Sequence, residues 1–189
     1  LDAMPQPEGW SNSTLRPFAT THTVPSCGWM IQQHAMAGKF DRQRADDLNL
    51  STKERAMLAR GEDVTTADGT TLESAWFRGG ERAPVSVLVS GDTAAMPPAW
   101  TDEVRPTLLI HEATFLDEQQ DKADEHQHST ATGAVASALA VGAESLALTH
   151  YSNRIKSTVE PVSEAKSAAG ALPVVALNDN DRMVVDDEG

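Results

Sequence analysis

The stretch LLIHEATFLDE, residues 108–118, joins an apolar run directly to a histidine and a glutamate. A short apolar run of this kind is typical of a buried strand, and this one ends on two side chains that can donate or accept protons. Two further apolar runs, VSVLVSGD at residues 85–92 and SLALTH at residues 145–150, also end on Asp or His. The chain therefore places chemically active side chains at the ends of its predicted strands.

The segment between the last two predicted strands, HSTATGAVASALAVGA at residues 128–143, predicts a helix with Ser129 or Thr130 as its N-cap. The order of strand, strand, helix and strand predicts an α/β fold. In sheets of this kind, ligands bind at the carboxyl ends of the strands. Three side chains are expected at such ends: Asp92, His111 and His150.

The remaining segments carry weaker signals. Residues 1–18 are rich in polar residues, proline and glycine and predict an irregular lead-in, whereas residues 38–61 predict a helical insertion. Asp68-Gly69 has the turn chemistry of a hairpin, and residues 172–177 predict a last strand. The acidic residues 116–126 predict a solvated loop.

The composition bounds the class of protein. The chain has 189 residues, enough for a single domain with a sizeable core, and 40% of them are hydrophobic. Its formal net charge of −13 argues against a generally nucleic-acid-binding surface but leaves room for a local basic patch. Cys27 is the only cysteine, which excludes an intrachain disulfide and fits a cytoplasmic setting. The most apolar segment, residues 131–149, is interrupted by two glycines and a glutamate, so no membrane span is predicted.

Six histidines are candidates for metal binding or proton transfer: His22, His34, His111, His126, His128 and His150. A lone histidine is most often structural or exposed, and from spacing alone Asp92 in SGDT is better explained as a carboxylate that caps a turn. Imidazoles combined with a carboxylate also suit zinc, and a carboxylate can bridge two such ions. The residue types alone leave both interpretations open.

Five motifs, taken in chain order, resemble those of ribonuclease Z, the tRNA 3′-end-processing branch of the metallo-β-lactamase superfamily. They are HTVPSCGW at residues 22–29, SGDT at 90–93, HEATF at 111–115, HST at 128–130 and THYSNRI at 149–155. The resemblance implies a four-layer αββα metallo-β-lactamase fold. Residues 1–189 would form a single domain or the C-terminal half of that fold, with the helical insertion at 38–61.

Carried over residue by residue, the resemblance implies a site for two zinc ions (Zn²⁺). His22 and His150 would each bind one ion, and Asp92 would bridge both. His128 would donate a proton to the leaving oxygen, and Glu112 would orient His128 through a hydrogen bond.

Three more residues would support this site. Arg154 would contact a substrate phosphate, and His111 would support the strand that carries Glu112. Thr93 would hydrogen-bond the carboxylate of Asp92. The implied activity is that of a zinc-dependent endoribonuclease, in which a metal-activated hydroxide cleaves precursor tRNA at the phosphodiester 3′ of the discriminator nucleotide. The resemblance also implies a cytoplasmic homodimer.

The chain departs from the family pattern at two places. The HxHxDH motif, which supplies most of the family's metal ligands, is absent from the sequence. Together with Leu1 in place of an initiator methionine, this absence predicts a missing N-terminal half that carries HxHxDH. Residues 38–61 lie where the family has its tRNA-gripping arm, but they contain no Gly-Pro pair and mix acidic residues with six basic ones.

These departures keep two alternatives open. One is another metal-dependent hydrolase of the same fold, a phosphodiesterase or a lactonase-like enzyme. The other is a non-catalytic half-domain that pairs with a second chain and is stable and dimeric without zinc. An enzyme half would instead expose an apolar sheet face and aggregate without its missing part.

Overall fold

The computed structural model describes residues 6–35, 38–80, 82, 84–101 and 103–185. Two compact units make up the chain, one of Leu1–His34 with Val85–Gly189 and one of Ala35–Pro84. We call the first the sheet unit and the second the small unit. Residues 1–5 of the predicted lead-in lie outside the described residues.

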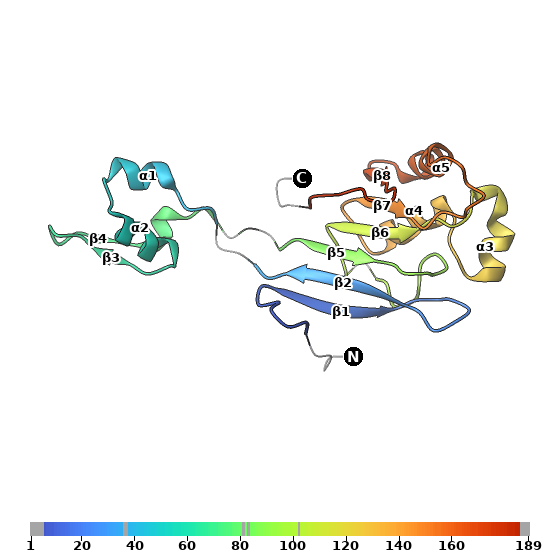
Figure 1. Ribbon diagram of the computed structural model, residues 1–189, viewed down its shortest axis with the longest axis horizontal. Helices are drawn as coiled ribbons and strands as arrows, with labels where there is room; N and C mark the ends of the chain where they lie inside the picture. Colours follow the sequence, from blue (N-terminus) through green and yellow to red (C-terminus); the bar gives the residue numbers. More distant parts are fainter. Residues whose placement is uncertain (1–5, 36–37, 81, 83, 102, 186–189) are drawn as a thin grey trace. The chain divides into compact units, whose positions relative to one another are not determined.

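The sheet unit is built on a six-stranded mixed sheet with the order β1-β2-β5-β6-β7-β8 (Figure 1). Its strands are β1 Ser13–Ala19, β2 Cys27–Gln33, β5 Ser86–Val89, β6 Leu108–Glu112, β7 Leu146–Thr149 and β8 Val174–Ala176. The first three are antiparallel neighbours, whereas β5, β6, β7 and β8 run parallel. The four strands predicted from the sequence are confirmed, and they form the parallel part of the sheet.

The prediction of an irregular lead-in over residues 1–18 is wrong for its last third, because Ser13–Ala19 form strand β1. This strand pairs along its whole length with β2, and Phe18 is buried in the core. Pro17 conceals the strand in the sequence, since proline cannot donate a ladder hydrogen bond. At the edge of a sheet that donor is not required, so Pro17 is tolerated there.

The helices of the sheet unit follow β6 and β7 in the chain (Figure 1). They are η2 Asp117–Gln119, α3 Gln120–His126, α4 Ala131–Ala140 and α5 Val159–Ala169. Thr130 caps α4 by accepting a hydrogen bond from the Gly133 amide at 3.1 Å. The prediction of a solvated loop over the acidic residues 116–126 is wrong for Gln120–His126, which form α3. The side chain of Ala123 is buried and packs this helix against the protein. No helix of the described residues is long and apolar enough to span a membrane.

One face of the sheet packs against the helices. Residues paired across parallel strands point to the same face, so Leu88, Leu109 and Leu146 lie side by side. They share a core with Val135 and Ala138 of α4, and all five side chains are at most 1% exposed. Burying one such leucine stabilises the fold by roughly 2 kcal/mol.

The opposite face of the sheet, which we call the open face, is also apolar. Its side chains are Leu15, Pro17, Trp29, Ile31, Val87, Val89, Leu108, Ile110, Ala147 and Val175. Leu108 and Ala147, at the centre, are buried, but the others are only partly buried or exposed. Glu112 continues the alternation of Leu108 and Ile110, so its side chain lies on the same side of β6 as the open face.

The small unit has a core of its own around Ala45, Leu58 and Phe77. Its elements are α1 Arg42–Asp47, α2 Thr52–Ala59, β3 Val64–Thr65, β4 Thr71–Leu72 and η1 Ser74–Phe77. Ser51 and Glu54 form a capping box at the start of α2. The hairpin predicted at Asp68-Gly69 is confirmed, because β3 and β4 pair antiparallel around this turn. Residues 38–61 lie within this unit together with the hairpin.

We expect lysine substitutions at neighbouring positions of β5 to distinguish the two faces of the sheet. In residues 1–189 expressed alone, Val87→Lys should reduce binding of an apolar dye and leave the circular dichroism spectrum unchanged, because Val87 lies on the open face. Leu88→Lys should unfold the sheet unit, because it places an unpaired charge in the core. Unfolding by both substitutions to the same extent would contradict the open face.

Candidate active site

The buried carboxylate of Glu112, at the end of β6, accepts four hydrogen bonds. Oε1 accepts from the Thr93 amide at 2.7 Å and from His128 Nδ1 at 2.6 Å. Oε2 accepts from Thr114 Oγ1 at 2.5 Å and from the Ser129 amide at 3.1 Å. The carboxylate is 1% exposed, so these four donors replace the water that it loses on folding.

The four donors also decide what Glu112 can do. An ionised carboxylate has about four lone-pair positions, and all of them are used here. Glu112 therefore suits the orientation of His128 better than the binding of a metal ion. Because Nδ1 of His128 donates to the carboxylate, a proton can be gained or lost only at Nε2.

The SGDT loop after β5 brings Asp92 and Thr93 to the same place. Gly91 has a φ of +62°, and a Cβ atom there would lie 2.8 Å from the Cys27 carbonyl oxygen, so only glycine fits. The Thr93 hydroxyl donates to the Ala94 carbonyl at 2.9 Å and accepts from the Thr21 amide at 3.1 Å. The expected hydrogen bond from Thr93 to the Asp92 carboxylate is thus replaced by contacts that join this loop to Thr21 and Glu112.

His22 lies beside His128, with 4.7 Å between the two ring centroids. Its Nδ1 is 3.0 Å from the backbone oxygen of Gln127, the residue that ends α3 in the left-handed conformation. A carbonyl oxygen only accepts, so Nδ1 of His22 carries the hydrogen. Nε2 is left with a lone pair, the arrangement of a metal-binding histidine.

His150 lies on the other side of His128, with their rings stacked at 5.8 Å. Its Nε2 is 3.5 Å from Asp92 Oδ1, and its Nδ1 is 3.0 Å from Thr114 Oγ1. The Thr114 hydroxyl gives its hydrogen to Glu112, so it accepts from Nδ1 of His150. His150 therefore also keeps the lone pair on Nε2, directed to the same region as Asp92.

Two sets of side chains in the described residues have atoms close enough to share a metal ion: His22, Asp92 and His128 in one, and Glu112, His128 and His150 in the other. Within each set the ligand atoms lie within 4.8 Å of one another. Imidazole nitrogens and carboxylate oxygens are the donors that zinc takes. Because Glu112 and His128 are hydrogen-bonded to each other, His22, Asp92 and His150 are the side chains that fit a divalent metal. The structure brings His22, Asp92 and His150 together around His128.

His111 lies apart from this cluster, on the helix side of β6. It is fully buried, its Nδ1 donates to the Glu112 carbonyl at 2.8 Å, and its ring meets Trp100 edge to face. Burial lowers the pKa of His111, because the imidazolium would lose its hydration; the Glu112 backbone hydrogen bond and carboxylate oppose this effect. His111 thus sits neutral behind the strand end that carries Glu112.

Arg154 is exposed in the loop after β7, where its amide donates to Ser152 Oγ at 3.4 Å. It belongs to neither of the two metal-binding sets. Sequence reasoning missed Thr114 and Gln127, which fix the hydrogens of His150 and His22. The role of Thr114 could have been found from its position inside the HEATF motif. The role of Gln127 could not, because only its backbone oxygen contacts His22 and no side-chain type is required there.

No family model matches the chain. A metallo-β-lactamase fold protein from Bacillus subtilis is similar in structure, with a TM-score of 0.55 and 17% sequence identity, over 91% of this chain and 50% of that one. Human tRNase Z, short form, is similar with a TM-score of 0.50 and 20% identity, over 93% of this chain and 44% of that one. The chain has the metallo-β-lactamase fold, as predicted.

Comparison of sequences identifies the family more narrowly than comparison of structures. The protein named Ribonuclease Z from Synechococcus sp. (strain CC9605) is 39% identical over 167 residues, which are 87% of this chain and 52% of that protein. The chain is homologous to ribonuclease Z over most of its length, which confirms the resemblance drawn from its motifs. It spans about half the length of the curated relatives that it matches.

We expect Gly91→Ala to destabilise the sheet unit more than Gly9→Ala. Both glycines have a positive φ, which costs an alanine about 1 kcal/mol. Only Gly91 also meets a backbone oxygen, which adds at least about 1 kcal/mol and displaces Asp92. Urea unfolding of the two variants measures the difference, and equal losses would contradict the close packing of the SGDT loop.

We expect acid to destabilise the protein through His111. The lowered pKa means that the folded state binds a proton less readily than the unfolded chain, whose histidines titrate near 6.5. The contribution of neutral His111 to the free energy of unfolding is complete above pH 6.5. As the pH falls from 6.5 toward the pKa of His111 in the folded protein, this contribution decreases by up to about 1.4 kcal/mol per pH unit.

Urea unfolding at pH 7.5 and 5.5 tests this expectation. His111→Gln should show a smaller loss of stability on acidification than the unsubstituted protein. The exposed His34→Gln serves as the control and should keep the full pH dependence. An unchanged pH dependence in His111→Gln would show that His111 is not the group responsible.

Proposed function

We propose that this chain is the C-terminal half of a zinc-dependent endoribonuclease that processes the 3′ end of tRNA. The observation that carries the proposal is the hydrogen-bonded pair of Glu112 and His128, placed next to His22, Asp92 and His150. This arrangement puts a proton donor beside side chains suited to divalent metal ions. The name of the sequence relative, Ribonuclease Z, supports precursor tRNA as the substrate.

Residues His22, Asp92 and His150 would hold the metal, with Asp92 between two ions. Zinc ions bound there would activate water and offset the negative charge of the phosphate. Each ion would have about two ligands from this chain, fewer than the three that catalytic zinc usually takes from its protein. We therefore infer that the remaining ligands come from an HxHxDH motif in an N-terminal half.

The chain's own residues supply the proton that the leaving oxygen takes. A water molecule that has released one proton to the solvent adds to the phosphorus 3′ of the discriminator nucleotide, and the bond from phosphorus to the 3′ oxygen breaks. His128 gives the proton on Nε2 to that leaving oxygen, while the Glu112 carboxylate keeps the ring in place and stabilises its positive charge. Arg154 contacts a neighbouring phosphate, Thr93 fixes Glu112 through its amide, and His111 supports the strand end from behind.

The open face of the sheet supports the same proposal. A half of an αββα fold leaves uncovered the sheet surface that its other half would cover, and the open face is apolar and partly exposed. We propose that the N-terminal half covers it, in a cytoplasmic homodimer. Residues 38–61 would be the helical insertion at the position of the family's tRNA-gripping arm, but we assign them no contact with tRNA, because acidic residues are mixed with their six basic ones.

Two alternatives remain as outcomes of the test. Another metal-dependent hydrolase of this fold, a phosphodiesterase or a lactonase-like enzyme, would cleave small phosphodiesters or lactones and leave precursor tRNA intact. A non-catalytic half-domain would cleave none of these substrates and would dimerise without zinc.

We expect His128→Asn to lower cleavage of precursor tRNA by about a hundredfold or more, because the variant cannot protonate the leaving oxygen. Zinc content measured by elemental analysis should stay at the unsubstituted level, which separates proton donation from metal binding. His126→Asn, two residues away and exposed, is the matched control and should keep full activity. Full turnover by His128→Asn would contradict the assigned role.

A further inference from the structure

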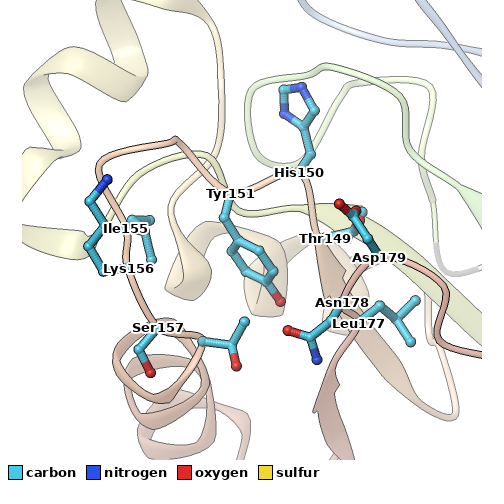
Figure 2. A pocket seen from close by; sticks show the side chains of 10 residues that line it. Thr149, His150, Tyr151, Ile155, Lys156, Ser157, Leu177, Asn178 and Asp179 are labelled. Atoms are coloured by element: carbon cyan, nitrogen blue, oxygen red, sulfur yellow. The ribbon is translucent and has the colours of Figure 1, made fainter.

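A cavity of about 580 Å³ lies beside His150, between the ends of β7 and β8 and the loop that leads into α5 (Figure 2). The Tyr151 side chain stands in its middle, with the loop of Lys156 on one side and Asn178 on the other. Cavities of this size hold small organic ligands. His150 lines the cavity and is 3.5 Å from Asp92, so the cavity adjoins the metal-binding side chains directly.

The walls of this cavity combine flat, apolar and hydrogen-bonding surfaces. Tyr151 offers an aromatic ring, and Leu177 adds apolar surface. The Tyr151 hydroxyl donates to the Leu148 carbonyl at 2.8 Å, which anchors the end of the side chain. Its ring is thereby fixed as a surface on which a nucleobase can stack.

Asn178 supplies a group that reads the edge of a base. Its amide nitrogen donates one hydrogen to Asp181 Oδ2 at 3.1 Å, and its backbone amide donates to the same oxygen at 2.8 Å. The Asn178 side chain is therefore held in place. Its amide oxygen and its second N–H are not used in the contact with Asp181. An amide with a donor and an acceptor pairs with the matching edge of a nucleobase.

The charges of the cavity fit a nucleoside better than a second phosphate. Lys156 contributes one positive charge and Asp179 one negative charge, and Lys156 Nζ already donates to the Asn153 carbonyl at 2.7 Å. A carboxylate repels phosphate but accepts hydrogen bonds from ribose hydroxyls. The phosphate of a bound nucleotide would lie outside the cavity, toward His150 and Asp92.

We propose that this cavity binds the nucleoside attached to the scissile phosphate on the trailer side, with its base on Tyr151 and Asn178 and its ribose hydroxyls near Asp179. This inference rests on the proposed endoribonuclease function and adds a specificity site to it. A nucleoside 5′-monophosphate is the matching probe, because the trailer keeps the phosphate on its 5′ carbon.

Fluorine NMR tests the proposal, because it observes the Tyr151 ring directly. Full-length protein is labelled with 3-fluorotyrosine, and the Tyr151 signal is assigned by its loss in Tyr151→Phe. Adenosine 5′-monophosphate should shift this signal in a saturable manner, whereas inorganic phosphate alone should not. Absence of a shift with the nucleotide, or an equal shift with phosphate, would overturn the proposal.

Asn178→Ala should weaken binding of adenosine 5′-monophosphate about tenfold. Asn153→Ala, which replaces an exposed asparagine of the neighbouring loop, should change this affinity less than twofold.

His128→Asn separates this proposal from the proposed function. If His128→Asn is inactive but Asn178→Ala binds the nucleotide normally, the assignment of the cavity fails and the endoribonuclease proposal stands. If His128→Asn remains active while Asn178→Ala loses nucleotide binding, the endoribonuclease mechanism fails and the assignment of the cavity as a nucleotide site stands.

Discussion

The buried Glu112 carboxylate depends on four hydrogen bonds, and the rest of the site depends on Glu112. Its donors come from the loop after β5, from the segment directly after β6 and from the turn between α3 and α4. One negative charge thus joins three segments that are distant in sequence. Loss of any donor would leave part of a buried charge unsatisfied, at a cost of about 1 to 3 kcal/mol. The same contacts fix the ring of His128, so its proton can move only at Nε2.

The sheet brings the remaining groups to this carboxylate. Parallel strands β5, β6 and β7 end at one edge, which places Asp92, Glu112 and His150 side by side. His22 lies in the connection between β1 and β2, where the Thr21 amide donates to Thr93 Oγ1 and the Thr21 carbonyl accepts from the Ala94 amide. Because Glu112 follows the alternation of the open face, the site lies at the margin of that face. A second half that covered the open face would reach the same edge and could complete the metal ligands.

Much of this arrangement was predictable from the sequence. Apolar runs ending on Asp or His predicted three of the four parallel strands, β5, β6 and β7, and the strand-end position of Asp92, His111 and His150. Strand β1 was missed because Pro17 is read as a strand breaker, and only its place at the sheet edge makes it acceptable. Helix α3 was missed because its acidic residues hide a single buried alanine, Ala123. The roles of Thr114 and Gln127 depend on contacts across 36 and 105 positions of the chain, which no local pattern contains.

The central claim is that His22, His128 and His150 all carry a hydrogen on Nδ1 and direct Nε2 to a common region. Long-range proton–nitrogen NMR of the histidine rings measures this directly, because protonated and unprotonated ring nitrogens resonate far apart. The account predicts three Nδ1–H rings in the metal-free protein at neutral pH, and a zinc-induced change at Nε2 of His22 and His150. A ring of His22 or His150 with its hydrogen on Nε2 would contradict this arrangement. Full activity of Glu112→Gln, in a protein whose His128 Nδ1 has lost its hydrogen bond, would also contradict it.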